Sequence, residues 1–143
     1  MSARSTLTTE DVLALLNERL ETYEHRPQQI ELAHAIERTF RTQQTGLFEA
    51  GTGIGKSYAA LIPAILSGKK VVVSTNTIAL QEQYINKDIP ALKAILPFQF
   101  DAALMKGRGN YLGLRRFEDH LLEQQIDEDF VDWVHDTETG DMS

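Results

Sequence analysis

Cysteine is absent from this 143-residue sequence. Its absence excludes disulfides, thiolate zinc sites and iron–sulfur clusters held by cysteine. No apolar run approaches the roughly 20 residues that a membrane-spanning helix needs. The polar residues 1–10 also lack the apolar centre of a signal peptide. We therefore expect a cytoplasmic protein with no membrane partner.

Basic residues are fewer than acidic residues, 14 against 21, which gives a net charge of −7. The two kinds of charge are unevenly distributed along the sequence. Acidic and basic side chains balance over residues 1–100. Residues 102–116 carry four basic side chains and no acid, whereas residues 117–143 carry ten acids and neither Lys nor Arg. A local basic stretch attracts phosphates even in an acidic protein, so nucleic acid is not excluded as a partner. We interpret the acidic stretch as a solvated helix face.

The apolar pattern predicts alternating helices and strands. Helices are expected at residues 10–23 with Thr9 as cap, 28–41 begun by Pro27, 56–66 with a kink at Pro63, 78–86 ending before Pro90, 112–125 and 130–135. Strands are expected at residues 47–49, 70–74 and 100–105. This alternation is typical of an α/β fold with a parallel sheet. Three strands are few for a nucleotide-binding domain, which suggests that the sequence is part of a longer one.

The strongest motif is the glycine loop, residues 49–57, which reads EAGTGIGKS between a predicted strand and a predicted helix. A P-loop has this form, because glycines let successive backbone N–H groups face one phosphate and the helix adds its positive end. Lys56 is the predicted catalytic cation for the β- and γ-phosphates, and Ser57 the predicted Mg²⁺ ligand. The predicted ATP-binding residues of the loop are Ala50, Gly51, Thr52, Gly53, Ile54, Gly55, Lys56 and Ser57.

Four motifs in order resemble those of DinG/XPD-type helicases of superfamily 2, over residues 23–116. Arg26-Pro27-Gln28-Gln29 is similar to the Q-motif, and the glycine loop is followed by Leu-Ile-Pro-Ala as in that family. Residues 73–77 and 80–83 resemble motif Ia, and residues 106–112 (KGRGNYL) resemble the start of the iron–sulfur domain. The resemblance implies that Arg26 and Gln29 read adenine. It implies nucleic-acid contacts by Thr75, Asn76, Thr77, Gln81, Lys106, Arg108 and Tyr111.

The sequence departs from the family pattern in two ways. Gly113 stands where cluster-bearing members have a cysteine, so the resemblance implies a branch without an iron–sulfur cluster. The Asp-Glu-Ala-His box and the second RecA-like domain with its arginine finger are not in this sequence. We therefore expect a partial RecA-like P-loop NTPase domain at residues 1–105, a parallel sheet flanked by helices. Residues 106–143 are expected to be the start of an inserted helical domain.

The resemblance implies an ATP-dependent DNA helicase with a role in DNA repair, using ATP and Mg²⁺ and acting on single-stranded DNA. We expect the 143 residues alone to bind ATP without hydrolysing it, since the remainder of the helicase is missing. The alternatives are a small P-loop kinase or a module that only binds nucleotide. At the level of residues, Arg26 and Gln29 could begin a surface helix, Thr77 could be an N-cap, and residues 106–116 could be a solvated loop.

Overall fold

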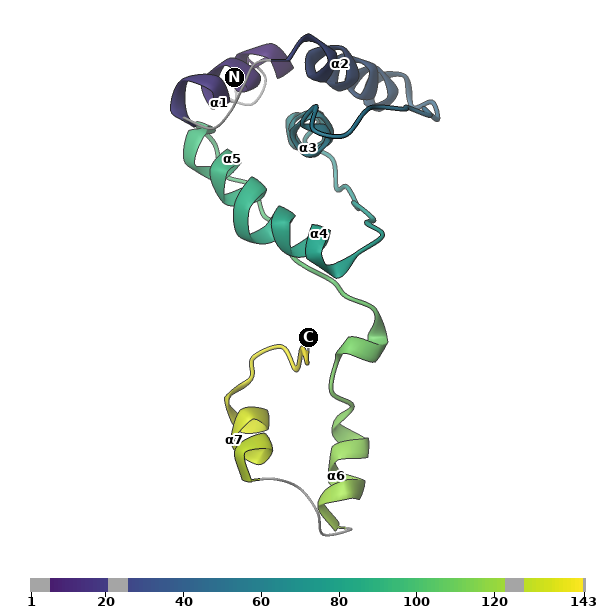
Figure 1. Cartoon of the computed structure of the whole chain (residues 1–143), viewed down its shortest axis with the longest axis vertical. Helices are drawn as coiled ribbons and strands as arrows, with labels where there is room; N and C mark the ends of the chain where they lie inside the picture. Colours follow the sequence, from purple (N-terminus) through teal and green to yellow (C-terminus); the bar gives the residue numbers. More distant parts are fainter. Residues whose placement is uncertain (1–5, 21–25, 123–127, 143) are drawn as a thin grey trace. The chain divides into compact units, whose positions relative to one another are not determined.

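The computed structural model describes residues 6–20, 26–122 and 128–142, and the regular secondary structure of these residues is helical (Figure 1). The chain forms two compact units, Met1–Ala103 and Leu104–Ser143. The first unit contains helices α1 to α5 and the glycine loop, and the second contains α6 and α7. None of the described helices is long and apolar enough to cross a membrane.

Helix α1 (Thr9–Arg19) begins at a capping box. The Thr8 hydroxyl accepts the Asp11 amide N–H at 3.1 Å, and the Asp11 carboxylate accepts the Thr8 amide N–H at 2.8 Å. The prediction that Thr9 caps this helix was wrong, because Thr9 is its first residue and is fully buried. Helix α1 also ends earlier than predicted, and Tyr23 lies outside the described residues.

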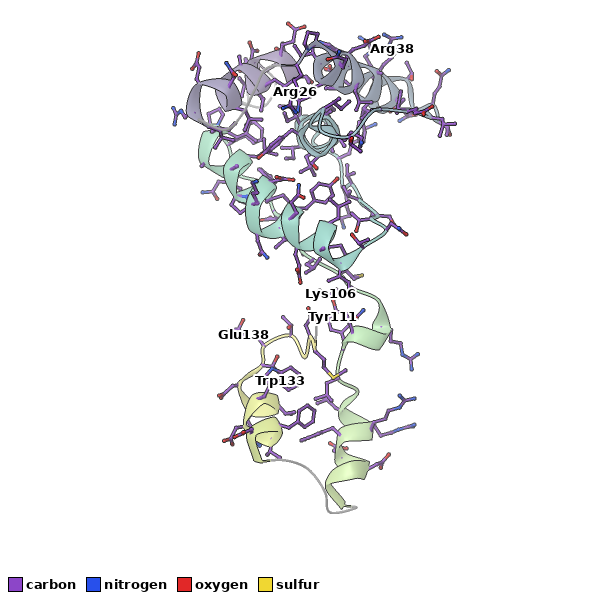
Figure 2. All side chains as sticks on the ribbon, in the orientation of Figure 1. Arg26, Arg38, Lys106, Tyr111, Trp133 and Glu138 are labelled. Carbon is purple, nitrogen blue, oxygen red and sulfur yellow. The ribbon has the colours of Figure 1, made fainter. Side chains whose placement is uncertain are left out.

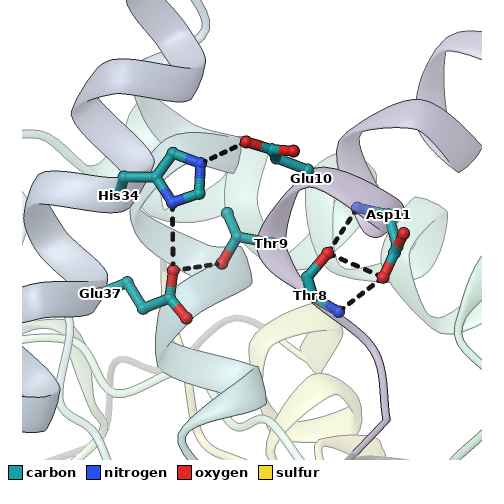
Figure 3. Close-up of polar contacts among 6 residues, drawn as sticks. All are labelled: Thr8, Thr9, Glu10, Asp11, His34 and Glu37. Atoms are coloured by element: carbon teal, nitrogen blue, oxygen red, sulfur yellow. Dashed lines mark hydrogen bonds and ion pairs between the residues drawn. The ribbon is translucent and has the colours of Figure 1, made fainter.

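Helix α2 (Pro27–Thr42) confirms the helix predicted at residues 28–41. Pro27 occupies its first turn, where a missing backbone N–H leaves no hydrogen bond unmade. A polar cluster joins α2 to α1 (Figure 3). His34 contacts Glu10 through Nε2 at 2.8 Å and Glu37 through Nδ1 at 3.3 Å, and the Thr9 hydroxyl donates to Glu37 at 3.2 Å.

Helix α3 (Lys56–Leu66) has the predicted bounds and starts directly at the glycine loop. Its residues Leu61, Ile62 and Pro63 are buried, because the helix packs against both α1 and α2. Proline inside a helix removes one backbone donor, so the backbone carbonyl four residues earlier loses its usual partner. The burial of α3 fixes the position of the residues that begin it.

The next helical stretch runs through a proline. Helix α4 (Ile78–Gln83) continues into a π-helical turn, η2 (Tyr84–Asp88), and then into α5 (Ile89–Ile95). The prediction that the helix must break before Pro90 was wrong. In the wider π turn the Ile89 N–H donates to the Tyr84 carbonyl, and Pro90 falls in the first turn of α5, where its missing N–H is tolerated.

The hydrophobic core of the first unit lies between α1, α2, α3 and α5. Leu13 and Leu16 of α1, Ile62 of α3 and Leu92 of α5 are at most 1% exposed. Each fully buried side chain of this size stabilises the fold by about 1.5–3 kcal/mol relative to leaving it exposed. This core anchors the α3 end of the glycine loop.

The predicted α/β fold with a parallel sheet is wrong for the structure described. Residues 47–49, 70–74 and 100–105 form no strand, and the described residues contain only one isolated β-bridge. The apolar side chains expected inside a sheet are exposed instead, with Leu47 at 100% and Val72 at 90%. Apolar β-branched runs favour extended backbone, but a strand exists only when a neighbouring strand accepts and donates its hydrogen bonds.

The second unit is closed by contacts between its beginning and its end. Tyr111 and Asp141 form the antiparallel bridge, flanked by hydrogen bonds from Leu112 N–H to the Gly140 carbonyl and from Met142 N–H to the Asn110 carbonyl, both 2.8 Å. Helix α6 (Leu114–Leu122) lies within the predicted 112–125, whose residues 123–127 are outside the described part.

Helix α7 (Glu128–Asp136) includes the predicted residues 130–135. Its aromatic side chains pack on α6. The Phe117 and Phe130 rings meet edge to face with centroids 5.9 Å apart, and Trp133 stacks on Phe130 at 5.5 Å. Figure 2 labels Trp133 on α7. Trp133 is half-buried and stacked within this aromatic cluster.

Candidate nucleotide-binding site

The glycine loop leaves its backbone open on one side. Gly53 and Gly55 have φ angles of +81° and +83°, which only glycine adopts without strain. A side chain added at Gly51 or Gly53 would meet no atom within 4 Å. The loop is therefore an accessible turn of backbone at the start of α3, which is the context in which helix N–H groups bind anions.

The Lys56 ammonium lies at the loop itself. Its Nζ donates to the Gly51 carbonyl at 2.8 Å and to the Ala50 carbonyl at 3.0 Å. The loop thus folds around the cation that the sequence predicted for phosphate binding. Ser57 follows on the first turn of α3 and is half-buried. An ammonium, a helix start and a hydroxyl are three of the groups with which P-loop proteins hold a Mg²⁺-bound triphosphate.

Gln29 reaches the same loop from the first turn of α2. Its side chain is 1% exposed, and its Nε2 donates to the Gly55 carbonyl at 2.9 Å. The sequence predicted that Gln29 contacts the adenine base of the nucleotide. No sequence signal predicted its contact with the loop backbone. Arg26, the other predicted adenine-reading residue, is the N-cap of α2, and its carbonyl accepts the Gln29 backbone N–H at 2.9 Å.

The predicted motif Ia residues form a turn before α4. The Thr77 hydroxyl caps α4 by accepting the Leu80 N–H at 3.3 Å, and the Thr75 hydroxyl donates to the Thr77 carbonyl at 3.1 Å. Asn76 is exposed, and Gln81 lies on the first turn of α4. The structure therefore gives Thr77 a local structural role, and nucleic-acid contact by this segment stays a prediction.

The predicted basic segment contributes two of its side chains to the closure of the second unit (Figure 2). The Lys106 ammonium is 2.8 Å from the Asp141 carboxylate and only 3% exposed, and the Tyr111 hydroxyl accepts the Lys106 backbone N–H at 2.8 Å. Arg108, by contrast, is exposed on the short 3₁₀ turn η3 (Arg108–Asn110). Of these three residues, only Arg108 is exposed, and its contact with nucleic acid stays a prediction.

The chain is similar to bacterial proteins that are named as ATP-dependent DNA helicases or as 3'-5' exonucleases. It is 35% identical over 136 residues to the ATP-dependent DNA helicase YoaA of Haemophilus influenzae, covering 90% of this chain and 21% of that protein. It is 36% identical over 139 residues to the 3'-5' exonuclease DinG of Bacillus subtilis, covering 90% and 15%. The YoaA helicase of Escherichia coli is 38% identical over 129 residues, covering 85% and 20%.

The chain thus spans about a fifth or less of the length of these relatives. No protein-family model and no solved structure matches it significantly.

Proposed function

We propose that this chain, a homologue of part of the DinG and YoaA enzymes, is the ATP-binding segment of an ATP-dependent DNA helicase. The observation that carries the proposal is the position of Lys56. Its ammonium is held by two carbonyls of an open glycine loop at the start of a buried helix. The relatives named as ATP-dependent DNA helicases support the same nucleotide and the same class of enzyme.

Each part of the loop has a distinct task in this proposal. The backbone from Ala50 to Gly55 surrounds the phosphates, Lys56 neutralises the β- and γ-phosphate charge, and Ser57 is the Mg²⁺ ligand. A helicase is driven by ATP hydrolysis, in which the γ-phosphoryl group of bound ATP is transferred to water and ADP is left. The 143 residues contain no Asp-Glu-Ala-His sequence, so we propose that they bind ATP and do not turn it over. They also contain no cysteine, so we propose that they hold no iron–sulfur cluster.

Single-stranded DNA is the proposed second ligand. Its candidate contacts remain Thr75, Asn76, Thr77, Gln81, Lys106, Arg108 and Tyr111. Among them Arg108 is an exposed cation, whereas the Lys106 ammonium is paired with Asp141. Adenine recognition by Arg26 and Gln29 likewise remains a prediction.

Lys56→Ala tests the nucleotide site. Charge-assisted hydrogen bonds contribute about 1.5–3 kcal/mol, so the affinity for MgATP should fall roughly 10- to 150-fold in isothermal titration calorimetry. Lys69→Ala is the matched control, because Lys69 is a lysine outside the loop whose Nζ donates to the Phe40 carbonyl. Equal ATP affinity in wild type and Lys56→Ala, both folded by circular dichroism, refutes the proposed site.

Arg108→Ala tests the DNA contact. A lost phosphate contact should weaken binding of labelled single-stranded DNA and lower the slope of log affinity against log salt by about 0.7. Arg41→Ala is the control, since Arg41 is an exposed arginine in the last turn of α2 and is not among the predicted DNA contacts. If the two variants show the same salt dependence as the wild type, Arg108 is not a DNA contact.

A further inference from the structure

The contact between Gln29 and Gly55 is tighter than a chance neighbour. The Gln29 amide donates to the Gly55 carbonyl at 2.9 Å, and a Cβ placed on Gly55 would overlap Gln29 Nε2. No heavy atom could occupy that position without displacing the amide. Gly55 is therefore a glycine for two reasons, its φ of +83° and the close approach of this side chain.

Gly55 is also the residue on which the geometry of the site depends. It is the N-cap of α3, and Lys56 follows it directly. Its carbonyl accepts the Gln29 side chain and also the Ala59 backbone N–H at 3.2 Å, which is the first hydrogen bond of the helix. A change in the orientation of this peptide group would move both the start of α3 and the direction of the loop.

We propose that Gln29 is a positioning residue that fixes the phosphate loop from α2, so that its contribution falls on the triphosphate and not on the base. The inference rests on the proposed ATP site. Gln29 is well suited to the task because it is buried in the first turn of α2 and its side chain carries a neutral donor. A carbonyl acceptor at 2.9 Å holds one of its two amide hydrogens within the protein.

This role differs from adenine reading in its dependence on the ligand. A residue that reads the base strengthens binding of ATP alone. A residue that sets the loop strengthens binding of any ligand with the same phosphate chain. Inorganic tripolyphosphate carries that chain and has no base, so it separates the two roles.

The experiment measures affinities of ATP, GTP and tripolyphosphate, each with Mg²⁺, for the full chain by calorimetry. Gln29→Met keeps the side-chain length and cannot donate, and Gln28→Met is the control at the exposed neighbouring position. We expect Gln29→Met to lower the affinity for all three ligands by the same factor, about 3- to 10-fold. Gln28→Met should lower the affinity for none of them. Leu16→Ala, a core variant on α1, controls for lost stability and should leave the affinities of the folded protein unchanged.

Loss of ATP binding with unchanged tripolyphosphate binding overturns the inference in favour of base reading. Unchanged affinities in Gln29→Met, with Lys56 still required, overturn the inference and leave the ATP site standing. Equal binding by wild type and Lys56→Ala overturns both.

Should Gln29→Met not fold, the wild type supplies a second test. The side-chain amide signal of Gln29 in ¹H–¹⁵N spectra is expected to shift on saturation with tripolyphosphate, because Gly55 is part of the phosphate site. An unshifted signal overturns the inference.

Discussion

At the scale of the residue, His34 is a titratable side chain of α2 that contacts α1. Both of its ring nitrogens face carboxylates, Glu10 on α1 and Glu37 on its own helix (Figure 3). Only the imidazolium has an N–H for each of them, whereas neutral imidazole has one N–H in total. The hydrogen bond to Glu10 raises the pKa of His34 above its ordinary 6.5, against a smaller opposing effect of burial. The charged groups Glu37, Arg38 and Arg41 share a surface hollow with His34.

A pKa raised by folding gives stability that is complete below the unfolded value and is lost as pH rises through the folded value. The contribution of His34 to the free energy of unfolding should therefore be complete well below pH 6.5 and be lost as pH rises above that value. Urea unfolding of wild type and His34→Gln at several pH values checks this, since the variant should show the shallower decline. Parallel curves for the two proteins contradict the assigned role of His34.

At the scale of the element, the capping box decides where α1 begins. The sequence prediction placed the cap at Thr9, one residue too late, because Thr8 and Thr9 are both good N-caps that precede the same apolar stripe. The structure identifies the cap through Asp11, which pairs with Thr8 as the third helical residue. The hydrogen bond from the Thr8 backbone N–H lowers the pKa of the Asp11 carboxyl.

Thr8→Ala should destabilise the first unit by about 0.5–2 kcal/mol, since one orphan N–H of α1 loses its acceptor. Thr8→Ser retains the hydroxyl and should recover most of that loss. Thermal unfolding of the three proteins gives the comparison. A serine variant as unstable as the alanine variant would show that the methyl group of Thr8, and not its hydrogen bond, is what stabilises α1.

The helices and the strands differ in how well the sequence predicted them. The bounds of α3 and most of α2 follow from local signals, namely the glycine before Lys56 and Pro27 at a helix start. The strands depend on pairing with other segments, which a local apolar run such as residues 70–74 does not specify. The π turn before Pro90 was missed for a related reason, because its wider hydrogen bonds leave no mark in residue spacing.

At the scale of the whole molecule, the position of Lys56 at the glycine loop was predictable from the sequence, whereas the contacts that support the loop were not. Residues 50–57 carry a pattern whose chemistry is local, so their arrangement around Lys56 follows from the sequence. The contact of Gln29 with Gly55 joins residues 26 positions apart, and the pairing of Lys106 with Asp141 closes the second unit. Contacts of this kind are set by tertiary packing, which one sequence alone does not reveal.

The central claim is that these 143 residues hold ATP through Lys56 without cleaving it. A single-turnover assay with γ-labelled ATP and excess protein tests both parts, by separating retained ATP from released phosphate. An arginine finger alone contributes about 10³–10⁵ to the rate of phosphoryl transfer, and this sequence is expected to lack one together with the acidic box. The wild type should retain ATP that Lys56→Ala does not, and should release phosphate no faster than that variant, with or without single-stranded DNA. Retention that is independent of Lys56, or phosphate release that requires it, would contradict the account.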